Sequence, residues 1–342
     1  MRPSLSVIAA CAAAGTMILA SCSGREGPPE PTESPQSRTA SPDLAVPEPP
    51  GALFDVGGHA LHLYCMGEGD RTVLLEAGLG GSSIEFRPLQ EELAATTRAC
   101  AYDRAGMGWS EPGPEPRTGE RIVDELEKLL QAAEERGPFV LAGHSFGGLT
   151  MLMFAEAHPE DVAGVVLIDS SHPRQDEAFA EIPELAAAQE AAIADLEGMA
   201  ARAEAGDVGA ADLLTLAPTP LPQDLRYQWA ALHAQPHSLR TVMAEDDGWA
   251  QTVRQVGGDR SLGDIPLIVL ARNLGIAEAA PELALTPEEA ARADSIWRSL
   301  QEDHLARSTN ARLVVAEASS HYIHFDEPEV VLAAIRSLAT TE

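Results

Sequence analysis

Basic residues are scarce in this sequence. Its 342 residues include 23 Lys and Arg against 53 Asp and Glu, which gives a formal net charge of −30. Recognition of nucleic acid requires a surface rich in Lys and Arg that faces the phosphates, and an acidic surface would repel them. The acidic residues are spread along the chain and form no block of the kind that acts as an interaction tail. The sequence therefore argues against nucleic acid as a partner and predicts a strongly solvated, acidic surface.

Signatures of metal and phosphate chemistry are missing as well. The histidines do not fall at the paired spacings of metal ligands, and the sequence has no His-Glu-x-x-His run. It also has no Gly-Lys-Ser or Gly-Lys-Thr loop of the kind that cradles phosphate. An apolar share of 45% is nevertheless ample for a buried core. The sequence indicates a globular protein that uses neither a metal nor another cofactor.

The amino-terminal apolar stretch, residues 6–20, is too short to cross a bilayer and continue as a stop-transfer segment. It follows Arg2, as in a signal peptide, and the sequence Leu-Ala-Ser-Cys at residues 19–22 ends it. This tetrapeptide resembles the lipobox of bacterial lipoproteins, in which the cysteine is acylated and becomes the new amino terminus. An ordinary cleavage site with an incidental cysteine is the alternative. We predict a signal peptide over residues 1–22 and an exported, extracytoplasmic protein that is anchored to the cell membrane by lipid on Cys22.

The next segment, residues 23–50, is rich in Pro, Ser, Glu and Gly and holds few apolar residues. A segment of this composition cannot bury enough apolar surface to offset the entropy that folding costs. We predict a disordered tether that lifts the folded domain off the membrane.

The sequence has four cysteines. Cys11 would leave with the signal peptide and Cys22 would be acylated. Export would then place Cys65 and Cys100 in a compartment where disulfides persist, so that one disulfide is possible. The alternative is a pair of buried free thiols, which pack as small hydrophobic side chains.

After the tether, short β-type runs alternate with helical patterns, as in an α/β fold whose mostly parallel sheet carries helices on both faces. Strands are predicted at residues 61–64, 72–76, 98–102, 139–142, 165–168, 267–270 and 313–315. Helices are predicted at residues 86–96, 117–135, 149–157, 291–306 and 329–338.

One long segment, residues 172–261, breaks this alternation. It shows no strand pattern, only Ala-, Glu- and Leu-rich helical sequence broken by prolines. A structureless loop of that length is uncommon in a compact domain. We therefore predict a helical cap over residues 172–261, inserted into a core that comprises residues 51–171 and 262–342.

The most informative motif is Gly-His-Ser-Phe-Gly-Gly at residues 143–148. It follows an apolar run and precedes a helical pattern, so Ser145 stands at a turn from strand to helix, which is the setting that a G-x-S-x-G nucleophile elbow requires. The flanking glycines leave room for neighbouring backbone, and the helix that begins behind Ser145 favours developing negative charge. We predict that Ser145 is a nucleophile, and a purely structural turn is the alternative.

Two further parts of a serine site can be assigned. The glycine-rich turn Ala-Gly-Leu-Gly-Gly at residues 77–81 follows a predicted strand, and its N–H groups can face a pocket without obstruction by side chains. We assign the backbone N–H groups of Leu79 and Phe146 to an oxyanion hole. The base is expected in the loop after the last strand, where His321 lies nearer the strand end than His324. We favour His321, with His324 as the alternative.

Three motifs together resemble those of the α/β-hydrolase fold family. They are the elbow at residues 143–148, the turn Tyr-Asp-Arg-Ala-Gly-Met-Gly-Trp-Ser at 102–110 and the segment Ser-His-Tyr-Ile-His-Phe-Asp-Glu-Pro at 320–328. The resemblance covers residues 54–171 and 265–338. It implies a sheet of about eight strands, Ser145 as nucleophile, His321 as base and a mobile cap over the site.

The resemblance bears on two other pairs of residues. In the sheet of this family the second and fourth strands are neighbours, which makes a disulfide between Cys65 and Cys100 geometrically possible. We interpret Asp103 and Arg104, in the turn at residues 102–110, as structural residues that tie loops at the sheet edge, with contact to the substrate as the alternative.

The acid that orients the base is the position that the sequence determines least. In the commonest arrangement of the family it follows the strand at 267–270, but residues 272–277 include no aspartate. Asp169 ends another predicted strand at the carboxyl edge of the sheet, where side chains face the same pocket as Ser145, and some α/β-hydrolases carry their acid there. We predict Asp169, with Asp294 as the runner-up and Glu278 as a further candidate. The alternative role of Asp169 is to fix the loop that follows it.

These assignments predict a serine hydrolase that cleaves a small to medium, partly apolar carboxylic ester through an acyl-enzyme. Leu79, Phe146, Met151 and Trp109 are the apolar residues expected near the pocket, although Met151 fits core packing better. Three alternatives remain: a haloperoxidase-like enzyme, a lipoprotein whose fold only binds a ligand, and a proline iminopeptidase-like enzyme. The last would hold a substrate amine with cap carboxylates, for which the candidates are Glu177, Glu181 and Glu184.

Overall fold

A computed structural model describes residues 45–256, 261–279, 283 and 285–340 of the chain. The predicted signal peptide, Cys22 and the predicted tether up to residue 44 lie outside the described residues. Residues 45–50 form no helix or strand, and the carbonyl of Pro47 accepts a hydrogen bond from the indole of Trp109 at 2.8 Å. The end of the predicted tether therefore lies against the folded domain.

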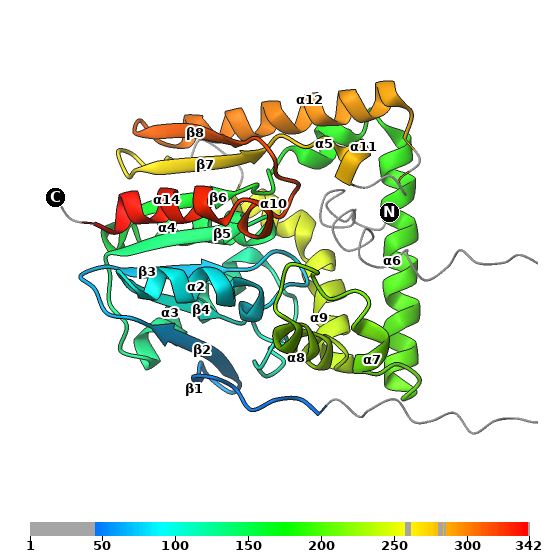
Figure 1. Cartoon of the computed structure of the whole chain (residues 1–342), viewed down its shortest axis with the longest axis horizontal. Helices are drawn as coiled ribbons and strands as arrows, with labels where there is room; N and C mark the ends of the chain where they lie inside the picture. The colour runs from blue at the N-terminus through cyan, green and yellow to red at the C-terminus, as the bar shows by residue number, and fades with distance from the viewer. Residues whose placement is uncertain (1–44, 257–260, 280–282, 284, 341–342) are drawn as a thin grey trace, which may run out of the picture.

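Eight strands form one sheet in the order β1-β2-β4-β3-β5-β6-β7-β8 (Figure 1). The β1–β2 and β2–β4 pairs are antiparallel, and all other neighbouring strands are parallel. The strands are β1 (Ala52–Asp55), β2 (Ala60–Met66), β3 (Thr72–Glu76), β4 (Arg98–Tyr102), β5 (Phe139–His144), β6 (Val162–Ile168), β7 (Leu267–Arg272) and β8 (Ala311–Ala316). The prediction of a mostly parallel, eight-stranded sheet is confirmed.

Helices cover both faces of this sheet (Figure 1). Because successive side chains of a strand point to opposite faces, the neighbours Leu74 and Leu75 of β3 belong to two different apolar clusters. Leu74 packs with residues of α3 and α4, whereas Leu75 packs with residues of α2 and α14. The helical elements outside residues 172–261 are η2 (Ser83–Phe86), α2 (Arg87–Ala94), α3 (Gly119–Ala132), α4 (Phe146–Ala157), η3 (Pro159–Asp161), α11 (Ile276–Ala279), α12 (Pro287–Asp303), η5 (His304–Arg307), α13 (Ile323–Asp326) and α14 (Pro328–Ala339).

Residues 172–261, which lie within the segment between β6 and β7, are hereafter called the helical insertion. Its described part, up to residue 256 and at residue 261, contains helices and no strand. The helices are α5 (Gln175–Phe179), α6 (Pro183–Glu204), α7 (Ala210–Leu213), α8 (Gln223–His233), α9 (Pro236–Asp247) and α10 (Trp249–Val256). α6 to α9 have an apolar cluster of their own, which Met107 joins from the core, and they gather at one end of the sheet (Figure 1).

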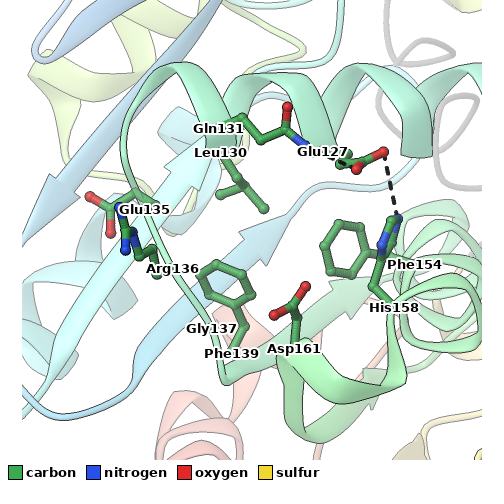
Figure 2. A pocket seen from close by; sticks show the side chains of 10 residues that line it. All are labelled: Glu127, Leu130, Gln131, Glu135, Arg136, Gly137, Phe139, Phe154, His158 and Asp161. Carbon is green, nitrogen blue, oxygen red and sulfur yellow. Dashed lines mark hydrogen bonds and ion pairs between the residues drawn. The ribbon is translucent and has the colours of Figure 1, made fainter.

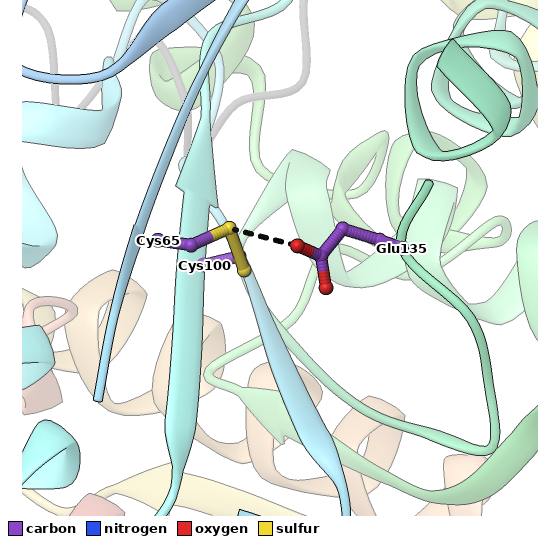
Figure 3. A group of neighbouring side chains, drawn as sticks. All are labelled: Cys65, Cys100 and Glu135. Carbon is purple, nitrogen blue, oxygen red and sulfur yellow. Dashed lines mark hydrogen bonds between the residues drawn. A yellow bond between two sulfur atoms is a disulfide. The ribbon is translucent and has the colours of Figure 1, made fainter. Parts of the chain in front are cut away.

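Cys65 and Cys100 face each other directly across β2 and β4, with their Cα atoms 4.0 Å apart, and a disulfide joins them (Figure 3). The carboxylate of Glu135 approaches this disulfide, with Oε1 3.8 Å from Cys65 Sγ, and it also pairs with Arg98. Two cysteines and a carboxylate within a few ångströms could suggest a metal site. Metals bind thiolates, however, and the bonded sulfur atoms are not thiolates, so Glu135 is the one ionisable ligand in this group.

Removal of the disulfide should destabilise the folded domain. The two cysteines are 35 residues apart in sequence, and closing a loop of that length is expected to contribute about 4 kcal/mol to the free energy of unfolding. We expect the variant with both Cys65→Ser and Cys100→Ser to lose that amount in urea unfolding of the folded domain. Reduced wild-type protein is the control and should match the variant. Equal stability of the variant and the oxidised wild type would contradict the prediction.

Within the part of the chain that the structure describes, no helix combines the length and the apolar composition that are needed to cross a membrane.

Candidate active site

Ser145 stands between the end of β5 and the first residue of α4, at a sharp turn with φ 51° and ψ −118°. A positive φ is strained for a residue with a side chain and is characteristic of a nucleophile elbow. The two glycines of the motif allow the close approach that this turn needs. A Cβ on Gly143 would lie 2.3 Å from the carbonyl oxygen of Gly147, and a Cβ on Gly147 would lie 2.6 Å from that of Ala77. The sequence therefore folds into the turn that its motif predicts.

Asp169 follows β6 directly and has a positive φ of 43°. Its backbone N–H donates to the carbonyl of Leu270 at 2.8 Å, so the residue is held between β6 and β7. The side chain is fully buried, and Oδ1 accepts hydrogen bonds from the N–H of Arg272 at 3.1 Å and from the indole of Trp297 at 2.9 Å. Burial alone would raise the pKa of the carboxyl. The hydrogen bond from His321 and the charge of Arg272 outweigh it and hold that pKa below its usual value.

His321 lies in the loop between β8 and α13, and its Nδ1–H donates to Oδ2 of Asp169 at 2.7 Å. This distance is within the 3.2 Å that is required of a base and the acid that orients it. The other ring nitrogen, Nε2, is buried and has no hydrogen-bond partner among the described residues, and the same holds for Oγ of Ser145. The ring of His321 packs against His144, the residue before Ser145, with centroids 4.6 Å apart. The structure thus brings Asp169, His321 and the elbow together at one edge of the sheet.

The competing candidates make other contacts. Asp294, on α12, accepts a hydrogen bond from the N–H of Ile276 at 2.9 Å and so fixes the loop after β7. The side chain of Glu278 lies outside the described part. His324 stacks on Phe86 with ring centroids 4.9 Å apart, and burial, together with the charge of His321, lowers its pKa to about 3. Of the two histidines after β8, His321 is the one that has a carboxylate partner.

His144 and His324 line the site beside His321, with ring centroids 4.6 Å from each other. Burial, helped by the charges of His321 and His324, lowers the pKa of His144 well below its usual value. His144 and His324 are therefore neutral at pH 7. Together they surround the base with aromatic rings that carry no charge.

The predicted oxyanion donors lie on either side of the elbow. Phe146 is the first residue of α4, so its N–H has no partner within the helix and is free to bind an anion. Leu79 lies in the turn between β3 and η2. The preceding residue, Gly78, is so close to the elbow that a Cβ added to it would lie 3.2 Å from Cβ of Ser145. The partly buried side chain of Leu79 packs against the apolar clusters of both the core and the helical insertion. The two N–H groups thus belong to segments that flank Ser145.

Asp103 and Arg104 follow β4 and tie loops together, as predicted. Asp103 accepts hydrogen bonds from His62 at 2.8 Å and from the N–H of Ser83 at 2.6 Å. Arg104 is buried and reaches both the turn at residues 77–81 and the helical insertion.

The other predicted residues contact several different parts of the fold. Trp109 contacts His62 and Pro47, and Met151 is fully buried in the core cluster, as the sequence favoured. Glu181 is exposed and forms an ion pair with Arg292. Trp297 and Arg272, which bind Asp169, were not predicted, because nothing in the local sequence marks contacts across 128 and 103 residues.

A surface pocket of about 370 Å³ lies at the opposite edge of the sheet (Figure 2). Phe139 at the start of β5 and His158 after the end of α4 line it, whereas Ser145 stands at the far end of both elements. His158 Nε2 lies 3.9 Å from a carboxylate oxygen of Glu127 in this pocket. This surface pocket is separate from the site that holds Asp169 and His321.

The order of the strands in the sheet, the elbow at Ser145 and the loop that carries His321 after β8 together define an α/β-hydrolase fold. Residues 73–334 match the model of the family described as "Alpha/beta hydrolase family", and the chain belongs to this family. It is 28% identical over 285 residues to the uncharacterized protein YqjL of Bacillus subtilis, an alignment that covers 82% of this chain and 89% of that protein. It is 24% identical over 297 residues to an AB hydrolase superfamily protein of Gibberella zeae, covering 78% and 85% of the two chains.

Solved structures show the same fold. A thermophilic esterase from Thermogutta terrifontis superposes with a TM-score of 0.56 and 23% identity, over 82% of this chain and 95% of the esterase. The epoxide hydrolase CorEH superposes with a TM-score of 0.59 and 16% identity, over 84% and 97% of the two chains. At these identities the likeness concerns the fold, and the chemistry must be argued from the site.

Proposed function

We propose that this protein is a serine hydrolase that cleaves carboxylic esters through an acyl-enzyme. The observation that carries the proposal is the buried hydrogen bond of 2.7 Å between His321 and Asp169, beside a serine on a strained elbow. A carboxylate on Nδ1 leaves Nε2 unprotonated and able to accept a proton. The buried and unpartnered Nε2 and Oγ are the atoms between which that proton would pass.

In the proposed reaction, Oγ of Ser145 attacks the ester carbonyl while Nε2 of His321 takes its proton. The carbonyl oxygen becomes an oxyanion that the N–H groups of Leu79 and Phe146 stabilise. When the tetrahedral intermediate collapses, the leaving alkoxide takes the proton from His321 and departs as the alcohol. Water, deprotonated by Nε2 of the same histidine, then attacks the acyl-enzyme. The bond between the acyl carbon and Oγ breaks as Oγ takes the proton back from His321, which releases the acid and free Ser145. Asp169 holds His321 in the tautomer with the proton on Nδ1, and it stabilises the imidazolium that forms when Nε2 takes the second proton.

The proposed substrate has a partly apolar acyl or alcohol part of small to medium size. Leu79 and Phe146 flank Ser145 with apolar side chains, and Leu79 also packs against apolar residues of the helical insertion. We propose that the insertion is the cap of the enzyme and that it forms the wall of the pocket opposite Ser145.

Labelling with a fluorophosphonate probe tests the proposal most directly. We expect stoichiometric modification at Ser145, and we expect the unmodified protein to hydrolyse p-nitrophenyl butyrate and the modified protein to have lost this activity. A protein that only binds a ligand would react with neither reagent. Proline p-nitroanilide tests the iminopeptidase alternative, and its cleavage at a higher kcat/KM than the ester would replace our proposal. Exposed Glu181, already paired with Arg292, gives that alternative little support.

We also propose that lipid on Cys22 anchors the protein to the outside of the cell membrane. The support is the sequence at residues 1–22. The Cys22→Ala variant should appear in the soluble fraction or keep its signal peptide uncut, because acyl chains supply the membrane affinity. Ser23→Ala is the matched control and should stay in the membrane fraction. A correctly exported Cys22→Ala variant that fractionates with membranes would refute the proposal.

A further inference from the structure

Arg104 makes the most concentrated set of polar contacts near the proposed oxyanion hole. The residue is 3% exposed and sits just after β4. Its Nη1 donates to the carbonyl of Ala77 at 2.6 Å, and its Nη2 donates to the carbonyl of Gly78 at 2.8 Å. The guanidinium carbon lies 5.2 Å from the centre of the ring of Phe146. One side chain therefore touches both segments that supply the proposed oxyanion donors.

The contact with Gly78 bears on the neighbouring residue through the geometry of the peptide bond. The carbonyl of Gly78 and the N–H of Leu79 belong to the same planar peptide group and point in opposite directions. A second donor, the N–H of Gly81, also binds the Gly78 carbonyl, at 3.1 Å. Holding this carbonyl from one side fixes the direction of the Leu79 N–H on the other. A hydrogen bond to the carbonyl also polarises the peptide and strengthens its N–H as a donor.

Arg104 is itself held by the helical insertion. Glu245, on α9, binds it through two hydrogen bonds, from Nε to Oε1 at 2.7 Å and from Nη2 to Oε2 at 2.9 Å. Both side chains are buried, and the two-pronged contact fixes the plane of the guanidinium. Nε and Nη2 of Arg104 donate hydrogen bonds to Glu245 on α9, while Nη1 and Nη2 donate to the carbonyls of the turn at residues 77–81. A displacement of α9 would therefore leave Arg104 free to release the two carbonyls.

We propose that Arg104 is a positioning residue that directs the Leu79 N–H toward the oxyanion. Through Glu245, this alignment depends on the position of the helical insertion against the core. The inference rests on the proposed serine hydrolase function and adds to it a link between the insertion and transition-state stabilisation. Arg104 touches neither substrate nor reacting atoms. Its effect should appear in kcat, because the oxyanion exists only in the transition state and the intermediates.

Two kinds of variant test the inference. Arg104→Lys keeps the charge but loses the planar guanidinium, whose three nitrogen atoms bind two carbonyls and a carboxylate at the same time. The double variant Arg104→Met/Glu245→Leu removes both members of this ion pair at once, so that neither is left facing an absent partner. It also removes the contact of Arg104 with the buried carboxyl of Glu76, which lies 3.5 Å from Nη1. The matched control is Arg117→Met/Glu125→Leu, which removes another buried two-pronged pair, with hydrogen bonds of 2.7 Å each. That pair makes no contact with residues 76–80 among the contacts described.

The first measurement is the kinetics of p-nitrophenyl butyrate hydrolysis alongside urea unfolding. We expect kcat to fall by about 10- to 100-fold in Arg104→Lys and in the Arg104/Glu245 double variant, with KM within about twofold, since loss of an oxyanion donor costs about 100- to 1000-fold. The control should lose stability at most and keep its kcat. An equal fall of kcat in the control and in the Arg104 variants would reduce Arg104 to a structural role.

The second measurement isolates the oxyanion. A trifluoromethyl ketone forms a hemiketal with Ser145, and the pKa of its hydroxyl, followed by ¹⁹F NMR, reports how well the site stabilises the anion. We expect this pKa to rise by about one in the Arg104 variants, a tenfold weaker stabilisation, and to stay unchanged in the control. Unchanged values in every folded Arg104 variant would overturn the inference. If wild-type protein reacted neither with the ketone nor with a fluorophosphonate, the proposed function itself would have failed.

Discussion

Replacing Ser145 with alanine should abolish ester hydrolysis and leave the fold unchanged. Turnover of p-nitrophenyl butyrate is expected to fall by about 10⁵-fold, because the variant has no nucleophile to form the acyl-enzyme. The hydroxyl is buried but makes no hydrogen bond with the described residues, so its removal leaves no partner unsatisfied. We expect the midpoint of thermal unfolding to stay within about 2 °C of the wild-type value.

Ser171→Ala is the matched control for this experiment. Ser171 lies near the same turn, its N–H donates to the carbonyl of Ser145 at 3.0 Å, and its own hydroxyl is buried without a partner among the described residues. This variant should keep both turnover and fluorophosphonate labelling. If Ser145→Ala retained more than a small fraction of wild-type turnover, another nucleophile would have to be sought.

Replacing Asp169 with asparagine should lower kcat by about 10³- to 10⁴-fold with little change in KM. Oδ1 of Asp169 already accepts two hydrogen bonds, from Arg272 and Trp297, so the amide oxygen of asparagine is expected to take that place. The amide NH₂ would then face Nδ1 of His321. That arrangement stabilises the tautomer with the proton on Nε2, which cannot accept a proton from Ser145.

Asp294→Asn is the control that separates the two candidate acids. Asp294 binds the N–H of Ile276, which an amide oxygen can also do, so this variant should turn over at close to the wild-type rate. The opposite pattern, with Asp169→Asn active and Asp294→Asn impaired, would reassign the acid.

The lowered pKa of Asp169 adds an expectation about pH. A carboxyl whose pKa is lower in the folded than in the unfolded state stabilises the fold above its ordinary pKa, near 3.8, and that contribution is lost only as pH falls through the lowered value. Asp169 therefore stays ionised throughout the range from about pH 5 to pH 8 in which His residues titrate. A fall in kcat/KM on the acid side of neutrality would report a group other than Asp169.

The sequence predicts most of the fold because the parallel strands of its centre are buried on both faces and read as continuous apolar runs. β1 escapes this signal because it is an edge strand, with Leu53 46% exposed. α4 begins at Phe146, three residues before the predicted start, because a helix that follows a nucleophile elbow begins without a capping side chain. Whether a segment is a helix or a strand can thus be predicted from its pattern of buried residues. The residues at which it begins and ends depend on contacts with other parts of the chain.

The site shows the same division. Ser145 is marked by a local motif, and His321 by its place after the last strand. The choice between Asp169 and Asp294 depends on whether the loop after β6 or helix α12 meets His321. That is decided by the pairing of β6 with β7 and by the hydrogen bond from Trp297 to Asp169. Arg104 belongs to a recognisable motif, but its partner Glu245 lies 141 residues away in a segment with no motif. Only the folded structure identifies such partners.

The contact between Arg104 and Glu245 limits how the helical insertion could be exchanged between related proteins. Residues 169–172, which join β6 to the insertion, are all buried, so a graft would have to begin after His172 to leave Asp169 in place. An incoming segment without a carboxylate opposite Arg104 would leave the buried guanidinium with only the 3.5 Å contact to Glu76 as an ion pair, at a cost of up to about 3 to 5 kcal/mol. A chimaera that acquires a new specificity would therefore need Arg104 and the grafted helix to change together.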